Sequence, residues 1–254
     1  MTRLSSKHPR YASLVTRARL AKAFRQGLVV PEGLIAHGRA EAFDYLLGER
    51  TPASARRAER LAVQWIRASR LPVISVNGNV AALAAEQIAS MVRLEPRIAV
   101  EVNLYHRTPQ RVAKILATLR RAGIPAPLGL RPTERIPCLP SDRARVDARG
   151  IGWADVVIVP LEDGDRTEAL RAIGKRVISI DLNPLSRTSQ KADLPIVDEL
   201  TRALGHMAED LRHPGRRTTP GDFQRADAPR LLRDAIRNIN LRLTKAASAR
   251  SPRP

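Results

Sequence analysis

The residues best suited to chemistry follow three apolar runs between positions 156 and 200. The first run, 156–161, ends in an acidic, glycine-containing loop that carries Asp163 and Asp165. Two carboxylates this close could hold Mg²⁺ through water, because Mg²⁺ takes oxygen ligands and keeps part of its hydration shell. A solvated acidic loop on the surface explains the same residues equally well.

The second run, 177–180, stops at Asp181, in front of a segment rich in hydroxyl, amide and guanidinium groups. Asp181 is placed to accept hydrogen bonds from a ribose or an adenine amine, although an Asp at this point can also simply form a turn. A guanidinium can bind phosphate with two parallel hydrogen bonds. The donors that could wrap a phosphate chain are Asn183, Ser186, Arg187 and Thr188.

The third run reaches residues 196–197 and is followed by a helical pattern. Asp198 is expected to cap this helix, because Asp is a favoured residue before the first helical turn. Such a cap would leave the amides of Glu199 and Leu200 facing the ends of the other strands.

Two earlier apolar runs also end in polar residues. Run 72–76 is followed by Asn77, Gly78 and Asn79 and then by a helical pattern over 80–94, so backbone N–H groups there could bind a phosphate or carboxylate. An ordinary Asn-Gly turn is the alternative. Run 98–104 is followed by His106 and Arg107, which suit an anionic substrate; a helix with Thr108 as its N-cap comes next.

The N-terminal part offers three further candidates. A helix is predicted over residues 7–25 with Arg17 within it, and from spacing alone Arg17 is a solvated side chain. The motif 33–41 leads into a helix predicted over 42–47, which places Arg39 at a helix start, where a cation is unfavourable unless an anion shares the site. His37 could be a general base, although a lone His is more often structural.

Apolar runs that alternate with helical patterns predict an α/β fold with a Rossmann-like parallel sheet flanked by helices, and such sheets bind ligands where the strands end. We expect an N-terminal helical region over 1–70 packed on a nucleotide-binding core over 71–213. A linker and a docked or subunit-bridging C-terminal helix follow over 214–245, then a basic, disordered tail over 246–254. Residues 125–150 are predicted to form an irregular surface excursion.

The composition favours a partner that carries negative charge. The formal net charge is +19 over 254 residues, which attracts polyanions, but only 3% of the residues are aromatic and can stack on bases. Phosphorylated small ligands are therefore favoured over nucleic acid. No apolar run is long enough to span a membrane, and the lone Cys138 cannot form an internal disulfide, so we expect a cytoplasmic protein.

Several familiar active-site patterns are absent. The sequence has no phosphate-binding Gly-x-x-x-x-Gly-Lys-Ser/Thr and no dinucleotide-type Gly-x-Gly-x-x-Gly after a strand. It also lacks Gly-x-Ser-x-Gly, His-Glu-x-x-His and paired cysteines. An atypical phosphate-handling site remains.

Five strings along the chain carry a resemblance to a known family: SxxHPRYxSLxTR, GLIAHGRAEAFDYLxGE, SVNGNVAAL, VPLEDGDRTEAL and IDLNPLSRT. They resemble the archaeal 4-phosphopantoate–beta-alanine ligases, also called phosphopantothenate synthetases, from about residue 6 to the final helix. The resemblance implies a Rossmann-like subunit, usually in a homodimer, that acts in coenzyme A biosynthesis. It implies ATP-dependent condensation of 4-phosphopantoate with β-alanine through an acyl-adenylate, giving 4'-phosphopantothenate, AMP and diphosphate.

The resemblance also assigns residues. Its ATP contacts fall on Arg17, Arg39, Asp181, Leu182, Asn183, Arg187, Thr188, Glu199 and Leu200. The family pattern has Asn at the position of Glu199, so only a backbone contact carries over there. The arginines would neutralise the ATP phosphates together with Mg²⁺.

The other substrates are placed by hypothesis. The hypothesised 4-phosphopantoate site consists of Asn77, Gly78, Asn79, His106 and Arg107. His37 is the candidate for deprotonating the β-alanine ammonium. Two rival functions remain: a basic nucleic-acid-binding α/β protein, and a dinucleotide-dependent oxidoreductase, which the missing glycine pattern disfavours.

Overall fold

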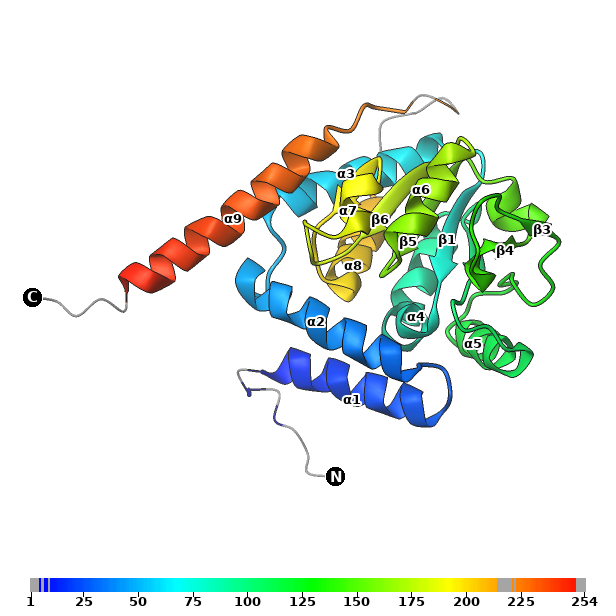
Figure 1. Ribbon diagram of the computed structural model, residues 1–254, viewed down its shortest axis with the longest axis horizontal. Coiled ribbons are helices and arrows are strands. Elements are labelled where there is room, and N and C mark those ends of the chain that lie inside the picture. Colours follow the sequence, from blue (N-terminus) through cyan, green and yellow to red (C-terminus); the bar gives the residue numbers. More distant parts are fainter. Residues whose placement is uncertain (1–4, 6, 9, 214–220, 222, 250–254) are drawn as a thin grey trace, which may run out of the picture.

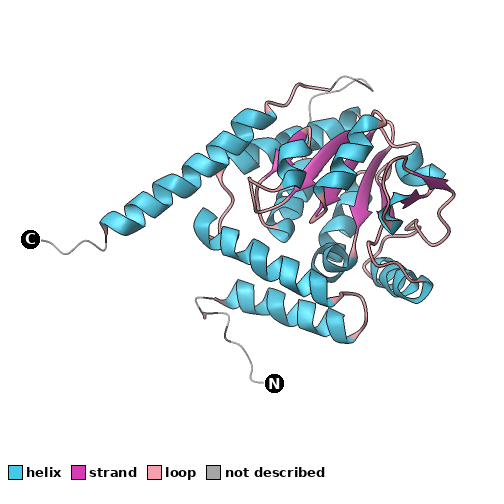
Figure 2. Ribbon diagram, in the orientation of Figure 1, coloured by secondary structure: helices cyan, strands magenta, loops and turns pink. Residues whose placement is uncertain are grey.

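The computed structural model is built on a five-stranded parallel sheet flanked by helices (Figures 1 and 2), and it describes residues 5, 7–8, 10–213, 221 and 223–249. The strand order is β2-β1-β5-β6-β7. From β1 the chain first adds β2 on one side and later β5 on the other, so the order reverses between β1 and β5. Their bounds are β1 Pro72–Val76, β2 Ala99–Val102, β5 Val156–Pro160, β6 Arg176–Ile180 and β7 Leu194–Ile196.

The strands were predictable because both faces of the sheet are buried. Every residue of β1 and β5 is buried, and a sheet covered on both faces needs continuous apolar strands. The register pairs Val73 with Val157 and Ile74 with Ile158. Alternate side chains therefore enter two separate hydrophobic cores, one on each face.

Helices cover the sheet unequally. One core is closed mainly by the apolar sides of four helices, with buried residues from the N-terminal and C-terminal helices as well, and the other by α6 together with residues 136–154. The helices on the first face are α3 Ala53–Ala68, α4 Gly78–Leu94, α5 Pro109–Arg121 and α8 Leu200–Arg212. On the other side are α6 Gly164–Ala172 and the short α7 Arg187–Lys191. None of the helices within the described ranges is long and apolar enough to cross a membrane.

The N-terminal helices α1 (Tyr11–Arg25) and α2 (Pro31–Leu47) lie side by side next to the sheet (Figure 1). The prediction that α2 begins at residue 42 was wrong, because the helix already starts at Pro31. The whole motif 33–41 is therefore helical, and Arg39 lies in the middle of α2 rather than at its start. Pro31 begins the helix with a fixed backbone angle, while Gly33 and Gly38 made the segment resemble a loop.

The prediction of a surface excursion over residues 125–150 was also wrong. This segment contains an antiparallel pair, β3 (Glu134–Arg135) and β4 (Arg145–Val146), and it buries Ile136 and Leu139. The buried Glu101 fixes the C-terminal end of this segment. Its carboxylate accepts hydrogen bonds from the backbone N–H of Asp147 at 3.1 Å and of Ile151 at 2.8 Å. Burial raises the pKa of Glu101, and these bonds act in the opposite direction.

The C-terminal helix α9 (Ala228–Ser248) packs on the body through its first half and extends away from it (Figure 1). Leu231 and Ala235 are buried, whereas Leu241 and Leu243 are 64% and 50% exposed. The tail predicted to start at residue 246 starts later, because α9 continues to Ser248. Residues 250–254 and most of the predicted linker 214–223 lie outside the described residues.

Helix α5 offers a test of its predicted cap. Thr108 accepts a hydrogen bond from the N–H of Arg111 at 3.2 Å, so Thr108→Ala should lower the free energy of unfolding by about 1 kcal/mol. Thr118→Ala is the matched control, because Thr118 bonds back to the Lys114 carbonyl at 3.0 Å inside the same helix and caps nothing. Since Ala has the higher helix propensity, the control should keep or gain stability in urea denaturation. Equal losses in both variants would contradict the cap.

Candidate active site

A cavity of about 700 Å³ opens where β1, β5 and β6 end and where α8 begins. Its walls come from α2, from the connections that follow these strands, and from two segments beyond β2. The reversal of strand order between β1 and β5 opens the crevice here, as in other open α/β sheets. A cavity of this size accommodates a small-molecule ligand such as a nucleotide.

The helices α4, α6 and α8 begin at this cavity. Gly78, Gly164 and Leu200, the first residues of α4, α6 and α8, all line it. The first N–H groups of a helix lack partners within the helix and carry partial positive charge. Gly164 also brings α7 close, since a Cβ there would lie 2.3 Å from the Cβ of Arg187. The cavity is therefore suited to anionic ligands before any side chain is considered.

The segment after β6 lines one wall, as predicted. Asp181 accepts a hydrogen bond from the N–H of Asn183 at 2.9 Å. Burial raises the pKa of Asp181, while this bond and the charge of Arg39 act in the opposite direction. Thr188 donates its hydroxyl to the Glu162 carbonyl at 2.6 Å, and Arg187 reaches Asp165 at 2.7 Å. From this segment Asp181, Leu182, Asn183, Ser186, Arg187 and Thr188 line the cavity.

The two carboxylates suggested for Mg²⁺ are not brought together. Asp163 lines the cavity and caps α6 by accepting the N–H of Arg166 at 2.9 Å, and its other oxygen pairs with Arg143. Asp165 does not line the cavity, and its side chain is 64% exposed. Within the described chain, no group of three or more metal-type ligands includes either residue.

A buried charge network at the floor of this site was not predicted from the sequence. Glu162, which is 2% exposed, is held between Arg143 and the fully buried Arg166, whose guanidinium lies 2.6 Å from Glu162 and 2.8 Å from the Ser75 hydroxyl. Glu162 directly follows a buried strand and lies four residues before Arg166. That spacing was a usable signal, whereas Arg143 comes from the segment predicted to be irregular and gave none.

The Asn-Gly-Asn segment lines the cavity, but its side chains are engaged. Asn77 is the N-cap of α4, accepting the N–H of Val80 at 3.1 Å, and it donates to the Leu161 carbonyl at 2.9 Å. Asn79 donates to the Gly33 carbonyl of α2 at 2.8 Å. Gly78 has no room for a side chain, because a Cβ would lie 2.2 Å from the Leu28 carbonyl oxygen. The segment thus offers backbone rather than amide side chains.

Beyond β2, the cationic groups at the cavity differ from those predicted. His106 lines the cavity, but Arg107 points away and donates to the carbonyls of Gly129 and Leu130. Arg111 and Arg143 line it instead. Burial lowers the pKa of Arg111, and the nearby positive charge of Arg143 lowers it further. Arg143 is paired with Glu162 and Asp163, whereas Arg111 has no carboxylate partner among the described residues and is the cation of this wall that an anion can bind.

In α2, His37 and Arg39 line the cavity. Burial lowers the pKa of His37, partly opposed by the charges of Glu41 and Glu199, so the imidazole is neutral at pH 7. Its Nε2 is buried without a hydrogen-bond partner among the described residues. A neutral imidazole with an open ring nitrogen can accept a proton.

The comparisons with known proteins agree with this geometry. A family model for phosphopantothenate/pantothenate synthetases matches residues 54–242. This chain belongs to that family. A 4-phosphopantoate–beta-alanine ligase from Methanospirillum hungatei is 48% identical over 240 residues, which cover 94% of this chain and 98% of the relative.

Two further relatives of the same name give the same result. The one from Thermococcus onnurineus is 46% identical over 252 residues, covering 97% of this chain and 96% of the relative. The one from Methanosarcina mazei is 45% identical over 251 residues, covering 98% of both. The resemblance seen in the five strings is therefore confirmed along nearly the whole chain.

Two residues assigned through the synthetase family need comment. Arg17 does not line the cavity; it binds Glu41 of α2 at 2.9 Å and so supports the helix that carries His37 and Arg39. Glu199 lines the cavity and caps α8, accepting the N–H groups of Thr201 at 2.8 Å and Arg202 at 3.0 Å. The predicted cap at Asp198 was wrong, because this residue is buried and bound to Arg202 instead.

Proposed function

We propose that this synthetase-family protein condenses 4-phosphopantoate with β-alanine at the expense of ATP. The observation that carries the proposal is the cavity at the strand ends, which unites Asp181 and its neighbours with cationic side chains in a chain of this family. A carboxylate is a poor electrophile, so the 4-phosphopantoate carboxylate would attack the α-phosphate of ATP and release diphosphate. The amine of β-alanine would then attack the acyl-adenylate and release AMP.

ATP is proposed to occupy the wall formed after β6. Asp181 can accept a hydrogen bond from the ribose or the adenine amine, and the buried Leu182 offers an apolar contact. Arg39 and Arg187, with the backbone N–H of Leu200 at the start of α8, would bind the phosphates. Arg17 would act indirectly, by holding Glu41 and hence α2.

The phosphate of 4-phosphopantoate is proposed to bind between Arg111 and Arg143, beside His106. Arg111 makes no ion pair with a carboxylate among the described residues and lies close to Arg143, and the first residue of α4, Gly78, lines the same cavity. The segment 77–79 would contribute through its backbone. Arg107 would only support the loop that carries the site.

Mg²⁺ and a second subunit belong to the same proposal. The ion is held mainly by substrate phosphates in sites of this kind, with one or two carboxylates; of the two residues suggested, only Asp163 lines the cavity. Asp165 is exposed and lies outside the cavity, so Asp163 and Asp165 together fit such an ion poorly.

The proposed second subunit would cover apolar surface on α9, where Leu241 and Leu243 are exposed.

The first experiment follows the nucleotide. With ATP, Mg²⁺ and 4-phosphopantoate, the protein should exchange labelled diphosphate into ATP without β-alanine, and AMP should accumulate only after β-alanine is added. ADP as the product would replace the adenylate by an acyl phosphate. No nucleotide turnover, together with salt-sensitive binding to nucleic acid, would favour the rival function.

His37 should act only in the second half-reaction. His37→Ala should lower kcat for amide formation by about 100-fold or more while diphosphate exchange continues. His8→Ala, an exposed histidine outside the cavity, is the control. Since the pKa of His37 is lowered, the unprotonated base persists below pH 6.5 and the acidic limb of kcat should lie below that value. Unchanged turnover in the variant would remove His37 from the mechanism.

Arg143 should affect one substrate more than the other. Loss of a charged hydrogen bond is worth about 1.5–3 kcal/mol, so Arg143→Gln should raise KM for 4-phosphopantoate by roughly 10- to 100-fold, with a smaller effect on KM for ATP. Arg131→Gln removes the same charge from an exposed position outside the cavity and should change neither. Equal effects of both variants would point to general electrostatics instead of a phosphate site.

A further inference from the structure

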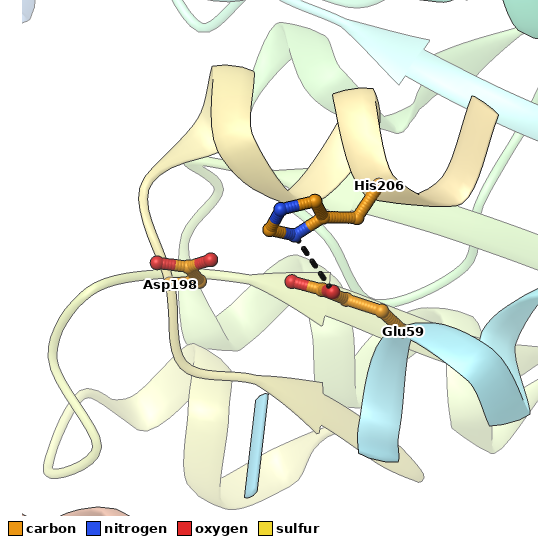
Figure 3. Close-up of side chains that lie close together, drawn as sticks. All are labelled: Glu59, Asp198 and His206. Atoms are coloured by element: carbon orange, nitrogen blue, oxygen red, sulfur yellow. Dashed lines mark hydrogen bonds and ion pairs between the residues drawn. The ribbon is translucent and has the colours of Figure 1, made fainter. Parts of the chain in front are cut away.

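A second cluster of ionisable side chains lies outside the cavity. Glu59 comes from α3, Asp198 from the connection after β7, and His206 from α8, and their side chains converge (Figure 3). Glu59 and Asp198 are 0% and 1% exposed, whereas the His206 side chain is 40% exposed. One nitrogen or oxygen atom from each lies within 4.8 Å of the other two. None of the three lines the cavity.

The cluster holds more negative charge than its cations balance. Arg56 is bound by Asp210 at 2.5 Å, and Arg202 is bound by Asp44 at 2.5 Å. With these two arginines matched by acids outside the cluster, two buried carboxylates remain, Glu59 and Asp198. Burial and the neighbouring charge of Asp198 raise the pKa of Glu59 to about 9, so without a cation this carboxyl holds a proton at neutral pH, and a bound cation would displace it.

One oxygen of the cluster has no partner. Oε2 of Glu59 lies 3.0 Å from Nδ1 of His206, but Oε1 is buried without a hydrogen bond among the described residues. In Figure 3 the carboxylate of Glu59 faces that of Asp198. A buried carboxylate oxygen left open toward a second carboxylate is costly unless a cation or a proton lies between them.

The surrounding residues hold the cluster in place. Thr51 donates to Oδ2 of Asp198 at 2.6 Å, and Arg202 donates to Oδ1 at 2.8 Å. Arg56 reaches Oε2 of Glu59 at 3.4 Å. Carboxylate ligands of metals are commonly oriented by such outer hydrogen bonds.

We propose that Glu59, Asp198 and His206 bind one divalent transition-metal cation, for which zinc is the best match. One imidazole nitrogen and two carboxylate oxygens form a ligand set that zinc accepts at about 2.0–2.2 Å, with a further position for water. The exposed side of His206 leaves that position open to solvent. A charge of +2 balances the two carboxylates.

A cation bound by Glu59, Asp198 and His206 would connect these three residues to the wall of the cavity. It ties α3 to α8 and to Asp198, which directly precedes Glu199 and Leu200 at the cavity. This site is separate from the Mg²⁺ that accompanies the nucleotide, because none of its ligands lines the cavity. Its expected role is structural: it holds the start of α8 where the cavity requires it.

Zinc alone, added to chelator-treated full-length protein without nucleotide, tests the proposal. Calorimetry and metal analysis should give one tightly bound zinc per chain and a higher Tm. Glu59→Gln and His206→Ala should each weaken zinc binding at least 10-fold. Glu59→Gln keeps the shape of the side chain and removes a buried charge, so it should fold without metal. His213→Ala, an exposed histidine at the end of the same helix, is the matched control.

Cobalt substitution adds a spectroscopic readout, since Co²⁺ in this site should show visible absorption that His206→Ala abolishes. Failure of the wild-type protein to bind zinc would overturn the proposal and leave a proton shared by Glu59 and Asp198 as the account of the cluster. Zinc binding that survives in both Glu59→Gln and His206→Ala would also overturn it. Both outcomes are independent of ligase activity.

Discussion

The pairing of β1 with β5 determines where this protein can do chemistry. The chain passes from β1 to β2 on one side and returns to add β5 on the other. The connections that leave the ends of β1 and β5 therefore run in opposite directions. Asn77 joins the two strand ends by donating to the Leu161 carbonyl at 2.9 Å. Because all five strands are parallel, every polar group that follows a strand lies at this same edge. The position of the cavity therefore follows from strand order before any functional residue is chosen.

The second constraint is the balance of buried charge around that edge. Glu162 is placed at the floor of the cavity by the strand before it, and it is tolerable there only because Arg143 and Arg166 both bind it. Arg202 similarly holds Asp44 and Asp198 together. Part of the basic composition thus has a structural task, which weakens net charge as an argument for nucleic acid. The arginines that line the cavity, Arg39, Arg111, Arg143 and Arg187, are the ones that a phosphorylated ligand can use.

The strands and the edge of the sheet that binds ligand were predictable from sequence because they depend on local patterns. Continuous apolar runs gave the strands to within about a residue or two, and the polar residues after them gave Asp181 and its neighbours. The failures have a common cause in long-range contacts. Helix α2 contains two glycines yet stays helical, since it packs against α9 and its Gly33 carbonyl accepts a hydrogen bond from Asn79. Arg143 becomes a cavity residue only because Glu101 and Glu162 fix a segment that has no periodic pattern.

The N-cap of α8 is Glu199, although Asp198 was expected, and this difference shows how long-range contacts act. Asp would be the better cap in isolation, but Asp198 is drawn inward by Thr51 and Arg202, and the next residue takes over the capping bonds. Asn, the residue that the family resemblance leads us to expect at position 199, is also a good cap, so Glu199 would preserve the local structure. The start of α8 is thus specified by a buried carboxylate on one side and a capping side chain on the other. The buried cluster and the cavity thus meet at one peptide bond, with Asp198 in the cluster and Glu199 at the cavity.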